Sequence, residues 1–131
     1  MQSSKSAKKL RALVVDDAPD IAVMLDVMLR QAGYDPLMAT CAADAILLAK
    51  RVQFDVVILD IAMPGMDGYS LIQSLRTLPE YSHVPMLSIT GFTQYDDPVR
   101  SHEAGFDAHM EKPIQPERLI AVIEDIRRRG H

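Results

Sequence analysis

The strongest fold signal in the chain is the stretch of residues 54–75, with the sequence FDVVILDIAMPGMDGYSLIQSL. Its opening residues, 54–59, are almost all apolar and rich in β-branched side chains, which is typical of a strand buried on both faces. Asp60 follows directly. Residues 63–68 contain proline and glycine and are expected to form a loop, and the apolar residues between 71 and 75 have helical spacing. The stretch therefore predicts a strand that ends in a carboxylate, then a loop, then a helix.

The same alternation of strand and helix continues on both sides of that stretch. Further strands are expected at residues 12–15, 34–39, 84–89 and 107–111, and helices at residues 20–32, 42–49, 96–103 and 119–126. Pro36 confines its strand to an edge of the sheet, because proline cannot donate a backbone hydrogen bond. Strands that alternate with helices form a parallel sheet with right-handed crossovers. The predicted fold class is therefore α/β, a doubly wound (βα)5 sandwich with helices on both faces of the sheet.

Length and composition fit one soluble globular domain. The chain has 131 residues, of which 48% are hydrophobic and 24% charged, close to the average for globular proteins. Residues 1–10 are expected to form a flexible basic arm, and residues 11–129 the folded domain. The formal net charge of -4 argues against a protein whose main task is to coat nucleic acid or anionic lipid.

Cysteine content and apolar runs bear on the cellular compartment. Cys41 is the single cysteine of the chain, so no disulfide can form within it, and the scattered histidines do not complete a zinc site. No apolar run approaches the ~18 residues of a membrane span. Residues 1–11 also lack an apolar core like that of a signal peptide. A cytoplasmic protein is therefore expected.

Polar side chains follow four of the predicted strands at the point where each strand ends. Asp16 and Asp17 follow the first strand, and Asp60 follows the third. Thr90 and Lys112 follow the fourth and the fifth. The carboxyl ends of parallel strands meet at one edge of a sheet, where ligands of such folds bind. These side chains are therefore expected to converge on one rim.

The chemistry of this rim suits a metal ion and a phosphoryl group. Two carboxylates roughly 4 Å apart repel by about 4 kcal/mol at an effective dielectric constant of about 20, so three of them need a compensating positive charge. A proton on one carboxylate could supply it, but Mg²⁺ is the better match for carboxylate, carbonyl and water oxygens. Lys112 and Thr90 add donors for an anion. This combination suits a phosphoryl group bound beside Mg²⁺.

Four stretches resemble the signature motifs of the receiver domains of two-component response regulators, the CheY-like superfamily found in bacterial signalling. They are VVDD at residues 14–17, LDIAMPGMDG at 59–68, SITG at 88–91 and EKP at 111–113. They occur in the family's order, and the resemblance covers about residues 10–128. It implies a five-stranded parallel sheet of order 2-1-3-4-5, as in the chemotaxis member of the family.

The resemblance implies that Asp60 accepts a phosphoryl group from a phosphohistidine. The donor would be a histidine kinase or a histidine phosphotransfer protein. Mg²⁺ would be bound by Asp17, by Asp60 and by the backbone carbonyl of Ala62. Asp16 would act mainly through a coordinated water.

Lys112 and Thr90 would contact the phosphoryl group itself. In the resembled family, the lysine ammonium stabilises the charge of the in-line transition state, and the hydroxyl bonds a phosphoryl oxygen. Pro113 is expected to be preceded by a cis peptide bond, which could aim the Lys112 ammonium inward. The resemblance therefore assigns the phosphoryl transfer to Asp60, Thr90 and Lys112.

The resemblance also implies a conformational switch at Thr90 and His109. Phosphorylation draws the threonine inward, and an aromatic residue three positions before the lysine turns inward with it. This alters the face built from helix 4, strand 5 and helix 5. His109 occupies the aromatic position here. Since an imidazole changes charge near pH 6.5, one hypothesis is that acidification weakens partner binding through His109, and the alternative is an exposed histidine without a role in switching.

A receiver domain is a phosphorylation-dependent switch rather than an enzyme with outside substrates, although it assists its own phosphoryl transfer and autodephosphorylation. The expected partners are the phosphate donor and a downstream protein target, without direct contact to nucleic acid or membrane. A monomer or a weak dimer is expected. Residues 90–92 and 104–109 look more like receivers attached to hybrid histidine kinases than like those of DNA-binding regulators. The chain is either a stand-alone regulator or part of a larger protein.

Three other functions fit the rim less well. A phosphohydrolase resembling haloacid dehalogenases needs a second aspartate two residues after the nucleophile, where this chain has Ala62. A receiver-like scaffold that acts without phosphorylation is disfavoured by the intact set of Asp17, Asp60, Thr90 and Lys112, and it stays open. Nucleotide binding lacks support, since no GxGxxG or P-loop sequence occurs.

Overall fold

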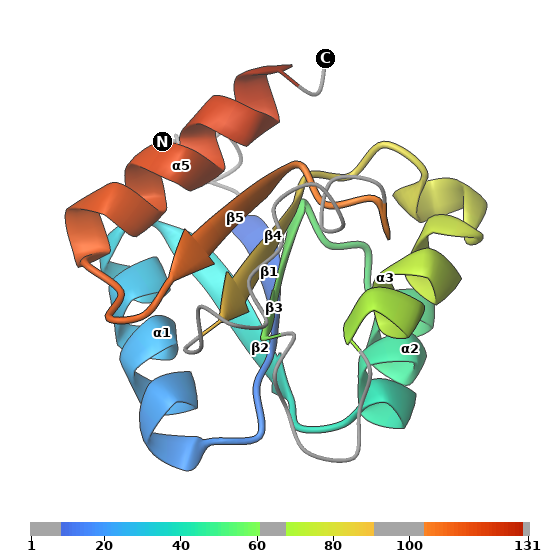
Figure 1. Ribbon diagram of the computed structural model, residues 1–131, viewed down its shortest axis with the longest axis horizontal. Coiled ribbons are helices and arrows are strands. Elements are labelled where there is room, and N and C mark those ends of the chain that lie inside the picture. The colour runs from blue at the N-terminus through green and yellow to red at the C-terminus, as the bar shows by residue number, and fades with distance from the viewer. Residues whose placement is uncertain (1–8, 61–67, 91–103, 130–131) are drawn as a thin grey trace, which may run out of the picture.

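One five-stranded parallel sheet forms the centre of the protein, with helices packed on both faces (Figure 1). The computed structural model describes residues 9–60, 68–90 and 104–129. The strand order is β2-β1-β3-β4-β5, and the neighbouring strands pair in parallel. The predicted α/β fold class and the strand order implied by the resemblance are therefore confirmed.

Strands and helices alternate along the chain as predicted. The strands are β1 (Leu10–Val15), β2 (Tyr34–Ala39), β3 (Val56–Asp60), β4 (Met86–Thr90) and β5 (Ala108–Glu111). The helices are α1 (Pro19–Gln31), α2 (Ala42–Arg51), α3 (Gly68–Arg76), the short 3-10 helix η1 (Pro79–Tyr81) and α5 (Pro116–Arg129). The helix expected at residues 96–103 lies outside the described residues. Within the described ranges, no helix has the length and apolar content needed to cross a bilayer.

Differences from the sequence prediction concern the ends of elements and η1, which the sequence did not predict. β1 begins at Leu10, which pairs with Tyr34, so the strand starts one residue inside the stretch expected as an arm. Residues 1–8 lie outside the described residues. β3 begins later than expected, at Val56, and the N–H of Phe54 donates to the hydroxyl of Tyr81.

Alternate side chains of each strand point to the two faces of the sheet. In β3, Val57 and Leu59 pack in the apolar layer that includes residues of α2 and α3. Val56 and Ile58 pack in the layer that includes residues of α1 and α5, on the other side of the sheet (Figure 1). All four are at most 1% exposed. The continuous apolar run in the sequence follows from this burial on both faces.

Tyr81, in η1, closes the end of α2. The residue is 1% exposed, and its hydroxyl oxygen lies 2.7 Å from the carbonyl oxygen of Val52 and 2.9 Å from that of Ala49. The N–H of Phe54 donates to the same hydroxyl at 3.1 Å. The last carbonyls of a helix have no partner within the helix, and two of them share the single proton of the Tyr81 hydroxyl. Burial raises the pKa of Tyr81, so the hydroxyl keeps the proton that it donates.

Replacing Tyr81 with Phe should lower the free energy of unfolding by about 1–3 kcal/mol, because carbonyl and N–H groups away from water lose their shared partner. Urea unfolding followed by circular dichroism measures the change. Tyr34→Phe is the matched control, since the hydroxyl of the buried Tyr34 accepts a hydrogen bond of 3.4 Å from Arg127, which is long and should contribute less. Equal losses in the two variants would contradict the role given to Tyr81.

Arg76, the last residue of α3, ties the start of β5 to β4. Its guanidinium donates to the carbonyl oxygens of Val84 and Gly105, at 2.7 Å and 2.6 Å. Its Nη2 also lies 3.0 Å from Oδ2 of Asp107, and that oxygen accepts the N–H of Met86 at 2.8 Å. One carboxylate therefore receives donors from α3 and from β4. Strand β5 begins at the next residue and is held in register with β4 from its first position.

Candidate functional site

The polar residues predicted for one rim follow strands that end at the same edge of the sheet. Asp16 comes directly after β1, and Asp60 is the last residue of β3. Thr90 is the last residue of β4 and pairs with Glu111, the last residue of β5, which Lys112 follows. Because all the pairs are parallel, these positions lie at the carboxyl edge of the sheet.

An ion pair connects β3 with the residue that follows β5. Nζ of Lys112 lies 3.0 Å from Oδ2 of Asp60 and donates a hydrogen bond to it. The Asp60 side chain is 7% exposed and that of Lys112 is 25% exposed, so the carboxylate is buried and the ammonium side of the pair is partly accessible to water. Hydrogen bonds between ionised groups are stronger than those between neutral groups. The peptide bond between Lys112 and Pro113 is cis, the isomer expected from the sequence.

Asp16 is a buried carboxylate whose charge is poorly compensated. The residue is 2% exposed. Its Oδ1 accepts the N–H of Ala18 at 2.9 Å, whereas its Oδ2 is buried and has no hydrogen-bond partner among the described residues. Burial raises the pKa of Asp16, and the charges of Asp60 and Asp17 raise it further, against the lowering effects of the Ala18 N–H and of Lys112. A cation at this place would favour the ionised form.

The structure describes only part of the predicted metal site. Asp17 is exposed. Ala62 lies outside the described residues, and at Thr90 the backbone is described without the side chain. In the described part of the chain, no three His, Cys, Asp or Glu side chains are grouped so that they could hold a metal ion. The carboxylates of Asp16 and Asp60 are the buried members of the predicted set.

The side chain of His109 is hydrogen-bonded to a residue of the neighbouring strand β4. Its Nδ1 lies 2.8 Å from Oγ of Ser88, and Ser88 is fully buried in β4. His109 was predicted from the sequence as a switch residue, whereas no role was predicted for Ser88. The available signal was a serine within the otherwise apolar stretch 84–89, because a polar group placed in a buried strand needs a partner.

Asp16→Asn should raise the free energy of unfolding at pH 7 when a chelator is present. The pKa of Asp16 is raised above its ordinary value of 3.8 in the folded protein, so the folded state binds the proton more tightly than the unfolded state. The contribution of this group is then most favourable below the unfolded pKa, and it is lost as pH rises toward the raised folded pKa. Asparagine carries no charge, and it keeps an oxygen that can accept the N–H of Ala18.

Urea unfolding at pH 3 and at pH 7, with EDTA throughout, measures this effect. The advantage of Asp16→Asn should be present at pH 7 and shrink at pH 3. Asp44→Asn, the same change at an exposed position in the first turn of α2, is the matched control. An advantage of Asp16→Asn that is the same at both pH values would contradict a buried charge as its cause.

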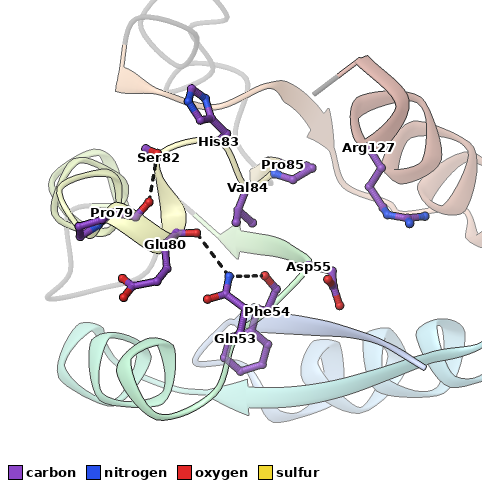
Figure 2. A pocket seen from close by; sticks show the side chains of 10 residues that line it. All are labelled: Gln53, Phe54, Asp55, Pro79, Glu80, Ser82, His83, Val84, Pro85 and Arg127. Atoms are coloured by element: carbon purple, nitrogen blue, oxygen red, sulfur yellow. Dashed lines mark hydrogen bonds between the residues drawn. The ribbon is translucent and has the colours of Figure 1, made fainter. Parts of the chain in front are cut away.

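A hollow lies at the opposite, amino edge of the sheet, as Figure 2 shows. Its volume is about 420 Å³. Its walls come from the residues that precede β3 and β4 and from α5: Gln53, Phe54, Asp55, Pro79, Glu80, Ser82, His83, Val84, Pro85 and Arg127. The side chain of Gln53 links the segment before β3 to the segment before β4. Its Nε2 donates to the carbonyl oxygens of Phe54 and Glu80, both at 3.3 Å. None of the residues predicted for the rim lines this hollow.

The family model of the response regulator receiver domain matches residues 12–124. This chain belongs to the response regulator receiver domain family. Receiver domains are the phosphoaccepting switches of two-component signalling systems. The resemblance of the four sequence motifs and the strand order of the sheet agree with this assignment.

Relatives of this receiver domain include both short and long proteins. Protein PilH of Pseudomonas aeruginosa is 33% identical over 116 residues, which cover 88% of this chain and 96% of PilH. The DNA-binding dual master transcriptional regulator RpaA of Synechocystis is 31% identical over 119 residues, which cover 91% of this chain and 49% of RpaA. The chain therefore spans about half the length of several curated relatives that it matches.

Solved structures share the fold of this receiver domain. The chemotaxis response regulator CheY4 of Vibrio cholerae is 28% identical and superposes with a TM-score of 0.84. The superposition covers 91% of this chain and 99% of CheY4. The likeness therefore extends over nearly the whole of that protein.

Proposed function

We propose that this receiver domain accepts a phosphoryl group on Asp60 from a phosphohistidine, carried by a histidine kinase or a histidine phosphotransfer protein. The ion pair between Asp60 and Lys112, 3.0 Å long, is the observation that carries the proposal. It places a shielded carboxylate and a cation together at the end of β3, the central strand. The carboxylate is a nucleophile, and the ammonium offers positive charge where phosphoryl oxygens would arrive.

The proposed transfer is a substitution at phosphorus. A carboxylate oxygen of Asp60 attacks the phosphorus in line with the bond to the donor's imidazole nitrogen. That bond breaks, its electron pair stays on the nitrogen, and an acyl phosphate forms on Asp60. Negative charge spreads over the equatorial oxygens in the transition state. Lys112 would stabilise this charge from a position that it already occupies, so little reorganisation is needed at the moment of transfer.

Receiver domains bind Mg²⁺ in their active site. In this chain the ion would be held by Asp17, Asp60 and the backbone carbonyl of Ala62, with Asp16 acting through a water. Two properties of Asp16 support this assignment: its Oδ2 is buried without a partner among the described residues, and its pKa is raised. Both are expected of a carboxylate that needs a nearby cation. When bound, Mg²⁺ supplies positive charge beside the phosphoryl group.

Phosphorylation would be transmitted through Thr90 and His109. A phosphoryl group adds close to two negative charges and strong hydrogen-bond acceptors, which would draw Thr90 toward Asp60. Thr90 ends β4, and β4 pairs with β5 through Ser88 and His109 as well as through Thr90 and Glu111. This pairing supports a response at His109. The altered face would comprise the helix expected at residues 96–103, β5 and α5, and a downstream protein would bind there.

The proposed partners are two proteins: the phosphohistidine donor, which acts upstream, and the downstream target. DNA binding belongs to relatives such as RpaA by their names and is not part of the proposal. A cytoplasmic location, a monomeric or weakly dimeric state and the absence of activity on outside substrates stay predictions.

The first test is the intact mass of the full chain after incubation with acetyl phosphate, with and without Mg²⁺. The expected result is the gain of one phosphoryl group that depends on Mg²⁺ and is absent in Asp60→Asn, since an amide is not a competent nucleophile here. Asp44→Asn, the same substitution at an exposed position, should gain the group like the wild type. Circular dichroism of Asp60→Asn checks that its fold is intact.

Acid-labile phosphate retained on Asp60→Asn would refute the assignment of the acceptor. A wild-type chain that gains no mass is tested again with beryllofluoride, which mimics the phosphoryl group without hydrolysing. No response to beryllofluoride in the presence of Mg²⁺ would contradict the proposed function and favour a scaffold that works without phosphorylation.

A further inference from the structure

Ser88 and His109 face each other across the pairing of β4 with β5. They are Cα partners in this parallel pair, so their side chains project from the same face of the sheet. Ala108 and Met110, the neighbours of His109, pack in the layer that includes residues of α1 and α5. His109 therefore points to the opposite face, where Met86 packs with residues of α2 and α3.

Two groups lie within hydrogen-bond distance of the Ser88 hydroxyl. Oγ lies 2.8 Å from Nδ1 of His109 and 3.4 Å from the carbonyl oxygen of Ala108. A hydroxyl has one proton to donate, and the shorter contact is the stronger hydrogen bond. The hydrogen bond between Oγ and Nδ1 is therefore the stronger of the two, and the tautomer of the imidazole decides which of these atoms donates.

This hydrogen bond restrains the orientation of the His109 ring. Nδ1 is the ring nitrogen nearer to the backbone, so a change to another staggered rotamer about Cα–Cβ would carry it away from Ser88. Ser88 cannot follow, because β4 is paired with β3 on one side and with β5 on the other. The ring is thus turned toward β4.

We propose that Ser88 is a positioning residue that holds the His109 ring against β4 in the resting protein and so limits how far His109 responds when Asp60 is phosphorylated. The proposal rests on the proposed function in treating His109 as the switch residue. The restraint itself exists before phosphorylation. A chain without the Ser88 hydroxyl would populate other ring orientations at rest and show a larger change on phosphorylation.

Nuclear magnetic resonance of the full chain, labelled with ¹⁵N and ¹³C, tests the resting restraint at about pH 8, where an ordinary imidazole is neutral. His109→Gln identifies the His109 signals. In the wild type, the side-chain couplings should report a single rotamer. In Ser88→Ala, the ratio of the β4-facing rotamer to the others should fall by about 2- to 10-fold, the effect of one neutral hydrogen bond.

Two further variants make the comparison specific. Ser74→Ala makes the same chemical change at an exposed position of α3 and should leave the His109 signals as they are. Ser88→Cys keeps nearly the same volume with a weaker donor, so it provides a second measurement if Ser88→Ala folds poorly. Its rotamer ratio should fall between those of the wild type and Ser88→Ala.

Identical His109 ring shifts and couplings in the wild type and in both Ser88 variants would overturn the proposal. Beryllofluoride with Mg²⁺ tests the second half of it: the His109 signals should change less in the wild type than in Ser88→Ala, and an equal or larger change in the wild type would also overturn it. A failure of the proposed function is distinguishable, because it would abolish the beryllofluoride response and leave the resting comparison intact.

Discussion

Parallel pairing brings the carboxyl ends of all five strands to one edge of the sheet, and the site depends on this constraint. Asp60 and Lys112 are far apart in the sequence and belong to strands that do not touch, since β4 lies between β3 and β5. Neighbouring strands are about 4.8 Å apart, so a side chain that joins β3 to the end of β5 has to pass the end of β4. The long, unbranched stem of Lys112 makes this reach possible, and its ammonium ends 3.0 Å from the carboxylate.

Strand β5 is attached at its two ends by different cations. Before its first residue, Arg76 pairs with Asp107, and after its last residue Lys112 pairs with Asp60. Between these points the strand has 4 residues and pairs with β4 as an edge strand. The central strand β3 differs, because its residues are buried on both faces. Side-chain contacts at both ends therefore help to position β5, whereas apolar burial positions β3.

Sequence patterns predicted the sheet and its carboxyl edge because both depend on local or repetitive signals. Continuous apolar runs marked the strands, helical spacing marked α1, α2, α3 and α5, and a carboxylate or cation directly after a strand marked the rim. The strand order came from the family resemblance, since periodicity does not determine which strands are neighbours. The stretch 96–103, with its weak apolar spacing, stays a prediction.

The features that the sequence did not predict are hydrogen bonds between side chains and distant backbone groups. Tyr81 binds carbonyls 29 and 32 positions away, and Arg76 binds a carbonyl 29 positions away. Neither contact has a local pattern, because a carbonyl is present at every residue. Ser88 is similar: its hydroxyl is conspicuous in an apolar strand, but its partner is known only once β4 and β5 are paired. At the site, Asp16, Asp60 and Lys112 were predicted together, whereas the unequal burial of Asp16 and Asp17 depends on packing.

The strand order also has a consequence for folding during synthesis on the ribosome. β1 and β2 are neighbours that emerge one after the other with α1 between them, so they can pair while synthesis continues. The other edge of β1 can pair only after β3 has been synthesised, because β3 is its partner and Ala12 lies opposite Val56. Until that segment emerges, one edge of β1, whose last four residues are apolar, is unpaired, and unpaired strand edges of this kind are sites of aggregation. The middle of the sheet is thus completed by a segment that is synthesised after β1, α1, β2 and α2.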